Sequence, residues 1–183
     1  MGRTRVAALD GARRVLAEHG LRKATMGDVA VRGGLAKATL YNHFRTKDDL
    51  VSGLVADDVD ALGADCRDLA ASDLVVALTR AADAVATHVV LVALRTVEPT
   101  ALVGACAPGA GARWDLVREQ VALVLDAADR SPAPEQVDLV CRWLATYAVE
   151  PGTQDDRAAA ARVLATGLPI TPRTTTFATP DPH

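Results

Sequence analysis

The sequence predicts an all-α protein with an N-terminal helix-turn-helix head of three helices and a larger C-terminal helical domain. Three observations support this fold class. Apolar residues recur at spacings of three and four along most of the 183-residue chain. Helix-start signals of the form Thr-x-x-Asp occur at Thr25, Thr46 and Thr153. Hydrophobic residues make up 50% of the chain but aromatic residues only 3%, so alanine, valine and leucine must fill a core of closely packed helices.

The first helix is predicted over residues 3–19. Its inward face consists of Leu9, Ala12, Val15 and Leu16. Gly20 would end the helix, because glycine readily adopts the left-handed conformation of a helix C-terminus. Arg3 and Arg5 would form a basic arm ahead of the helix, which either reaches a minor groove or remains a solvated terminus.

The most informative pattern is the helix-turn-helix itself. Thr25 and Asp28 predict the cap of a helix whose apolar stripe is Met26, Val29, Ala30 and Gly33. Gly34 would then turn the chain sharply, because glycine takes a positive φ at no steric cost. A short second helix follows, in which Leu40 and Phe44 lie four residues apart and face inward.

The outer face of this second helix carries side chains suited to DNA. They are Lys37, Ala38, Thr39, Tyr41, Asn42 and His43. Lysine and tyrosine can hold phosphates, asparagine can pair with adenine, and the methyl groups of alanine and threonine can contact thymine. Thr46 and Asp49 predict a third helix cap, and Lys47 lies at that helix N-terminus, where backbone amides favour a phosphate.

This segment resembles the TetR family of bacterial transcription regulators, whose pattern runs roughly T-x-x-x-[IV]-A-x-x-[AG]-G-[VL]-x-x-x-T-[LI]-Y-x-[HY]-F-x-x-K-x-x-L. The matching residues are Thr25, Val29, Ala30, Gly33, Gly34, Leu35, Thr39, Leu40, Tyr41, His43, Phe44, Lys47 and Leu50. The resemblance implies phosphate contacts from Thr25, Lys37, Tyr41 and Lys47, with Ala38, Thr39, Asn42 and His43 nearest the bases. It also implies a homodimer that binds a palindromic DNA operator, usually as a repressor, and a variable domain that binds a small-molecule effector.

Two residues of the head are unfavourable for helices. Ala36 stands where family members often carry a serine or threonine cap, and alanine there costs about 0.5 to 2 kcal/mol of helix stability. Gly11, inside the first helix, costs roughly 1 kcal/mol relative to alanine. Both predict a head that is somewhat soft without DNA, which amide exchange across residues 36–44 would test.

The net charge of −3 alone argues against nucleic-acid binding, but it conceals two oppositely charged regions. Residues 1–50 contain ten Lys or Arg and five Asp or Glu, a net charge of +5, so the rest of the chain carries −8. Two such heads in a dimer would supply salt-sensitive attraction to one duplex, while the acidic bodies stay away from the phosphates.

Helices are also expected through the rest of the chain. They would run from Lys47 into the sixties, over residues 72–97, over residues 113–129, from Pro134 to about residue 148, and over residues 158–168. Proline and glycine punctuate residues 99–111, which we interpret as an inter-helical loop. The expected domains are DNA binding over 1–47, effector binding and dimerisation over 48–168, and a disordered Thr- and Pro-rich tail over 169–183.

The helix that begins at Pro134 has two apolar faces. One is a stripe of Val137, Val140, Cys141, Leu144 and Ala148, whereas Leu139 and Trp143 lie elsewhere on the helix. We expect this helix and the last one to pair with their copies in a second subunit as a four-helix bundle. The alternative is that they close the core of a monomer.

An effector pocket is expected between about residues 51 and 150. The candidate lining residues are His88, Arg95, Glu98, Cys106, Trp114, Trp143 and Tyr147. Trp114 and Trp143 could equally be core residues, and Arg95 and Glu98 a solvated ion pair. The aliphatic composition favours a mostly apolar effector. The helix that begins at Lys47 would carry the signal to the head.

Other classes of function find less support. Cys66, Cys106 and Cys141 are expected to be buried apolar residues rather than disulfide partners or redox sensors. The histidines show no metal-ligand spacing, and no G-x-S-x-G, P-loop or dinucleotide motif occurs, so we expect no enzyme activity, metal or cofactor. No signal peptide or long apolar run occurs, which predicts a cytoplasmic protein. The nearest alternative is a DNA-binding regulator controlled by a protein partner, without a small-molecule pocket.

Overall fold

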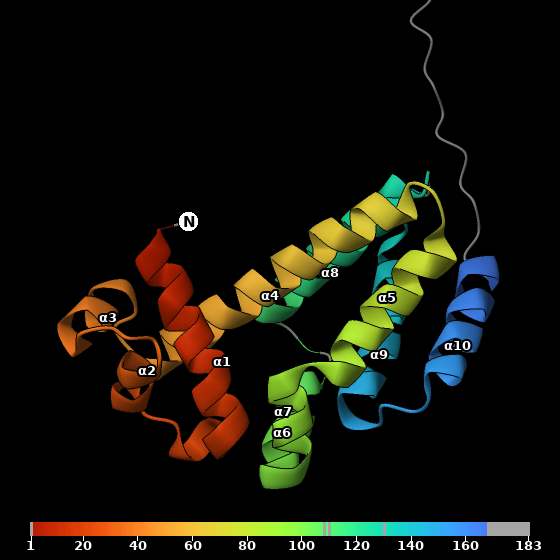
Figure 1. Cartoon of the computed structure of the whole chain (residues 1–183). Helices are drawn as coiled ribbons and strands as arrows, with labels where there is room; N and C mark the ends of the chain where they lie inside the picture. The colour runs from red at the N-terminus through yellow and green to blue at the C-terminus, as the bar shows by residue number, and fades with distance from the viewer. Residues whose placement is uncertain (1, 108, 110, 130, 168–183) are drawn as a thin grey trace, which may run out of the picture.

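The computed structural model describes residues 2–107, 109, 111–129 and 131–167, and these residues form ten α-helices and no strand (Figure 1). The N-terminal four are α1 (Arg3–Lys23), α2 (Met26–Arg32), α3 (Lys37–His43) and α4 (Lys47–Ala70). The other six are α5 (Leu74–Thr87), α6 (Val89–Val97), α7 (Pro99–Cys106), α8 (Ala112–Ala127), α9 (Pro134–Val149) and α10 (Gln154–Gly167). The predicted all-α class is confirmed, and the expected tail over 169–183 lies outside the described residues.

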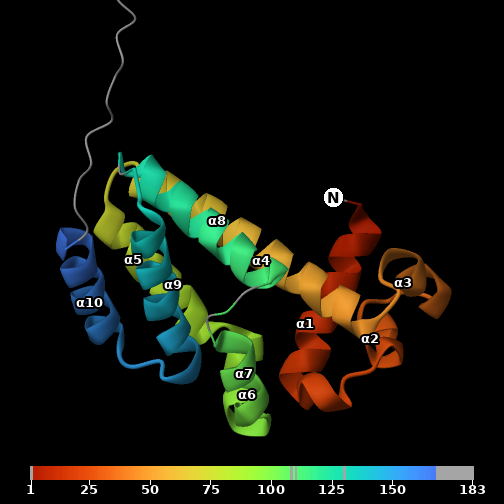
Figure 2. The same ribbon diagram turned by 180° about the vertical axis from the view of Figure 1, so that it is seen from behind.

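The long helix α4 joins the two ends of the molecule. Helices α1, α2 and α3 form a head at one end of α4, and α8 lies alongside α4 in both views (Figures 1 and 2). Helices α5, α9 and α10 pack at the other end, with α5 in contact with both α9 and α10. The short helices α6 and α7 pack together, and α6 also contacts α1.

The buried apolar residues form two clusters rather than one. The body cluster is built from α5, α8, α9, α10 and the C-terminal half of α4. The head cluster contains the apolar faces of α1, α2 and α3, and it also contains Val90 and Leu94 of α6 and Leu102 of α7. Helices α6 and α7 therefore share the core of the head, although the chain reaches them only after α4 and α5.

Two sequence predictions for this region were wrong. Residues 72–97 do not form one helix, because His88 adopts an extended backbone (φ −60°, ψ 123°) and separates α5 from α6 at a bend of 45°. The segment expected to be a loop after Val97 contains α7. Its Pro99 occupies a first helical position, where the missing N–H would have no helical partner.

The three Thr-x-x-Asp start signals are confirmed as helix caps. The hydroxyl oxygen of Thr46 accepts the N–H of Asp49, whose carboxylate accepts the N–H of Thr46, both at 3.0 Å. The Thr153 and Asp156 pair makes the same two bonds before α10. Among the described residues, no single helix is long and apolar enough to cross a membrane, and only the bent pair of α5 and α6 meets that test jointly.

Candidate nucleic-acid interface and ligand cleft

Helix α2 begins and ends on the predicted residues. The Thr25 hydroxyl accepts the N–H of Asp28 at 3.2 Å and donates to its carboxylate at 2.6 Å, and this bond lowers the pKa of Asp28. At the other end, Gly34 has a φ of 63°. The N–H groups of Gly34 and Leu35 donate to the carbonyls of Val31 and Ala30, which is the Schellman arrangement of a helix C-terminus.

The interpretation of Gly11 as only a weak helix former was incomplete. A Cβ at Gly11 would lie 2.7 Å from the carbonyl oxygen of Val29 and 2.8 Å from the nitrogen of Gly33. A Cβ at Gly33 would in turn lie 2.7 Å from the carbonyl oxygen of Ala7. The backbones of α1 and α2 therefore meet at two glycines, and this contact fixes how the helix-turn-helix sits on α1.

Helix α3 presents the predicted polar face to solvent. Leu40 is fully buried and Phe44 is 4% exposed, and the side chains of Lys37, Ala38, Asn42 and His43 are exposed, as is Tyr41 at 47%, with Thr39 half-buried. No side chain in the described part of the chain hydrogen-bonds to those of Tyr41, Asn42 or His43. Ala36 occupies the N-cap position and supplies no side-chain bond, as predicted.

Two of the predicted phosphate-binding residues, Lys37 and Lys47, lie near the Thr25 cap of α2. The Lys37 side chain crosses the first turn of α2, with its Cε 3.1 Å from where a Cβ of Gly27 would lie. The Lys47 ammonium donates to the carbonyls of Leu21 and Ala24, at 2.7 and 3.3 Å, and so fastens the start of α4 to the end of α1. Its role as a phosphate contact stays a prediction, beside this structural role.

The basic arm expected ahead of the first helix is absent from the described residues. Arg3 and Arg5 lie in the first turn of α1, and the Arg5 guanidinium stacks 5.2 Å from the centre of the Phe44 ring. Gly20 does not end α1 but interrupts it, with φ 75° and ψ 178°, before a last helical turn to Lys23.

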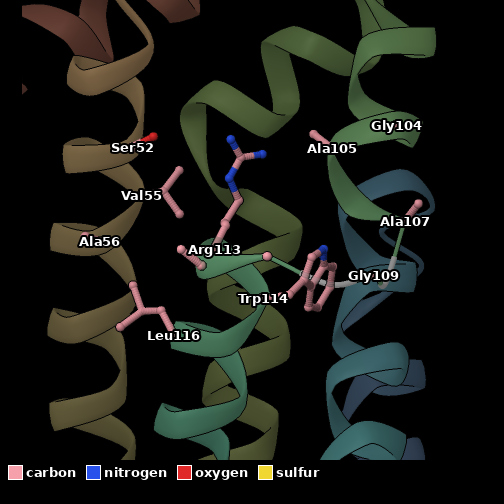
Figure 3. A pocket seen from close by; sticks show the side chains of 12 residues that line it. Ser52, Val55, Ala56, Gly104, Ala105, Ala107, Gly109, Arg113, Trp114 and Leu116 are labelled. Atoms are coloured by element: carbon pink, nitrogen blue, oxygen red, sulfur yellow. The ribbon is translucent and has the colours of Figure 1, made fainter.

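A cleft of about 520 Å³ lies between α4, the end of α7 and the start of α8 (Figure 3). Its lining includes Ser52, Val55 and Ala56 of α4, Gly104 and Ala105 of α7, and Arg113, Trp114 and Leu116 of α8. Figure 3 shows the Arg113 guanidinium extending into the space between α4 and α7. No carboxylate of the described residues pairs with it. The cleft thus combines small apolar side chains with one unpaired cation.

Of the seven candidate pocket residues, only Trp114 lines this cleft. Cys106 packs against the head cluster, and Trp143 and Tyr147 form an edge-to-face pair at 5.3 Å in the body cluster. Arg95 and Glu98 do not form the solvated pair offered as the alternative. Glu98 accepts the backbone N–H of Arg22 at 2.9 Å.

Arg95 instead closes the C-terminal ends of two helices. Its guanidinium donates to the carbonyl of Ala86 in α5 and to the carbonyls of Tyr147 and Ala148 in α9, at 2.7 to 2.8 Å. A cation is favourable at both ends, because each has unsatisfied carbonyls and a partial negative charge. No sequence pattern indicates this role, since the acceptors are backbone atoms and two of them lie more than 50 residues away in the chain.

The cysteines are free thiols, as expected. Cys66 and Cys141 are each 2% exposed, and burial raises the pKa of both thiols to about 11. Burial also raises the pKa of the half-buried Cys106, although Arg113 and Arg95 oppose it. Neutral thiols with raised pKa values are poor nucleophiles, so the pattern is that of packing residues.

Comparisons with known proteins agree with this architecture. Residues 8–54 match the model described as bacterial regulatory proteins, tetR family. The chain is 39% identical over 56 residues to the HTH-type transcriptional repressor Rv1474c of Mycobacterium tuberculosis, covering 31% of this chain and 30% of that one. It is 36% identical over 70 residues to the HTH-type transcriptional repressor KstR2 of Rhodococcus jostii, covering 38% and 34%. The matched segments thus span about a third of either relative.

A solved structure extends the likeness over nearly the whole fold. The TetR family repressor AlkX from Dietzia sp. strain DQ12-45-1b, described as implicated in biodegradation of n-alkanes, superposes with a TM-score of 0.66. The alignment covers 88% of this chain and 93% of that one at 19% identity. At this identity the likeness concerns the fold.

Proposed function

We propose that this chain, whose residues 8–54 match the tetR family of bacterial regulatory proteins, is a ligand-responsive repressor that binds a palindromic operator as a homodimer. The observation that carries the proposal is the exposed polar face of α3. Its apolar residues Leu40 and Phe44 are buried in the head, so the rest of the helix is free to enter a major groove.

Within this face we assign two kinds of DNA contact. Thr25, Lys37, Tyr41 and Lys47 would hold phosphates, and Ala38, Thr39, Asn42 and His43 would lie nearest the bases. The net charge of +5 over residues 1–50 would add attraction to any duplex.

In vitro selection from a pool of random duplexes tests the assignment. Asn42→Ala should lower affinity for the selected operator by about tenfold or more while leaving affinity for random duplex unchanged. Lys37→Ala should weaken binding to both DNAs, and should reduce the slope of log affinity against log salt concentration by about one unit. Equal loss on both DNAs for Asn42→Ala would remove Asn42 from the base contacts.

The dimer is proposed to form through α9 and α10. Leu139 of α9 is 51% exposed and Val163 of α10 is 72% exposed, although the opposite faces of both helices are buried in the body cluster. Exposed apolar side chains on two neighbouring C-terminal helices fit an interface with a second copy. Leu139→Asp with Val163→Asp should give monomers in sedimentation at micromolar concentration. Val31→Asp, at the 78% exposed Val31 of α2, is the matched control and should leave the dimer intact.

The effector is proposed to occupy the cleft between α4, α7 and α8. Its apolar lining suits the mostly apolar ligand that the composition favours, and the unpaired Arg113 adds an attraction for an anionic group. Decanoate should therefore raise the melting temperature more than decanol, and Arg113→Gln should remove the difference. If a panel of such ligands gives no stabilisation, the alternative of control by a protein partner is favoured.

A further inference from the structure

A polar cluster joins the head, α4 and the break between α5 and α6. Arg13 of α1 donates to the carboxylates of two consecutive residues of α4, with Nε 3.0 Å from Asp58 Oδ1 and a terminal nitrogen 2.8 Å from Asp57 Oδ2. The other Asp58 oxygen lies 3.1 Å from His88 Nε2. Asp10 of α1 accepts a bond from the remaining Arg13 nitrogen at 2.7 Å. We call Arg13, Asp57, Asp58 and His88 the α4 node.

The members of the node are held more firmly than a surface ion pair. The side chains of Arg13, Asp57 and Asp58 are 22 to 25% exposed and that of His88 is 30% exposed. Burial would raise the pKa of Asp58, but hydrogen bonds from His88 and Arg13 outweigh it and hold that pKa below its ordinary value. These partly buried charged groups fix the orientation of α1 relative to α4, because rotating one helix on the other would break several hydrogen bonds at once.

The node also lies beside the proposed ligand cleft. Val55 and Ala56, which line the cleft, immediately precede Asp57 and Asp58 in the same turn of α4. The other faces of that turn thus contact α1 through Arg13 and the start of α6 through His88. A movement of this turn would change the position of the head relative to the body.

We propose that the α4 node positions the DNA-binding head, and thereby sets the separation of the two operator half-sites that a dimer can bind. Asp58 is the central positioning residue of the node, since it accepts hydrogen bonds from Arg13 in the head and from His88 at the end of α5. This inference rests on the proposed function, because half-site separation has meaning only for a dimeric DNA-binding protein. One base pair of added spacer moves and rotates a half-site, so a fixed head should tolerate little change.

The test compares Asp58→Asn with Asp65→Asn. Both residues lie on α4 and pair with an arginine, but Asp65 pairs at 2.9 Å with Arg80 of α5 and not with the head. After wild-type selection of an operator, affinity is measured on duplexes whose spacer is one or two base pairs longer or shorter. Wild type and Asp65→Asn should lose about tenfold per base pair, and Asp58→Asn less than about threefold. His88→Gln, which keeps a donor, should lie between them.

A second measurement makes the outcome independent of the operator. Spin labels are attached at Val31 of α2 and Glu119 of α8, and the distance between them reports how the head sits on the body. Cys106 is replaced by alanine so that it takes up no label. The labelled protein is diluted with unlabelled protein so that distances within one subunit are measured. Asp58→Asn should broaden the distribution and Asp65→Asn should not. Circular dichroism first checks that both variants are folded. If Asp58→Asn then has the same distance distribution as wild type, or the same dependence of affinity on spacer length, the inference is overturned. Failure of the wild type to select any palindrome would instead count against the proposed function, and the distances would still decide the positioning role.

Discussion

The head and the body are stabilised in different ways, and the difference explains which of them can be predicted from sequence. In the head, the signals that set where the helices begin and end are local: the threonine caps of α2 and α4 and the turn at Gly34. In the body, arginines donate to backbone and carboxylate oxygens of helices far away in the chain, as Arg95 does to Ala148 of α9 and Arg157 of α10 does to Asp83 of α5. A local signal is visible in a sequence, whereas a long-range one needs the fold.

The largest expected effect tests the tight backbone contact in the head. Gly11→Ala should lower the free energy of unfolding by about 3 kcal/mol, because the new methyl group would overlap backbone atoms of α2 that cannot move aside separately. The gain in helix propensity, roughly 1 kcal/mol, is too small to compensate. Gly104→Ala is the control. A Cβ at Gly104 of α7 would meet no atom within 4 Å. Gly104→Ala should therefore raise the free energy of unfolding slightly, as measured by urea denaturation. Equal effects of the two substitutions would contradict the contact.

The second prediction concerns the long-range clamp in the body. Arg95→Met keeps the aliphatic part of the side chain but leaves the carbonyls of Ala86, Tyr147 and Ala148 without their donor, and should cost about 2 kcal/mol. Amide exchange should rise at the C-terminal turns of α5 and α9 together. Loss of protection in only one of those helices would show that the guanidinium does not join them.

The third prediction concerns the boundary between the two regions. Asp58→Asn should cost roughly 1 to 2 kcal/mol at neutral pH, since it removes a charged acceptor from Arg13 and His88. The pKa of Asp58 is depressed in the folded state, so its contribution is present above the ordinary aspartate pKa of about 3.9 and disappears as pH falls through the folded-state value. Unfolding curves of wild type and variant should therefore converge below about pH 4. A difference that persists in acid would indicate a packing effect.

The smallest effect is expected at the uncapped end of α3. Ala36→Ser supplies a hydroxyl that can accept the N–H of Ala38 or Thr39, and should stabilise the head by about 0.5 to 1 kcal/mol. Amide exchange should slow across residues 37–43 and remain unchanged in α9. If wild-type exchange is already slow there, the predicted softness of the free head is wrong.

These regions also mark where sequence-based reasoning succeeded. The ends of α2, the start of α4 and the exposed face of α3 follow from cap residues and spacing within a few positions of each other. The break at His88 could not be predicted, because no proline or glycine marks it and its side-chain partner Asp58 lies 30 residues earlier. Apart from Trp114, the lining of the cleft was not predicted, because most of it is alanine and glycine, which carry no sequence signal for a pocket.

The shared core of the head has a practical consequence for engineering. The segment that matches the family, residues 8–54, is smaller than the unit that packs together, since Val90, Leu94 and Leu102 complete the head from far along the chain. A head excised after α4 would expose the apolar surface that these three side chains cover, and would be prone to self-association. A chimaera that grafts this DNA specificity onto another sensor domain should therefore carry matching α6 and α7 helices with it.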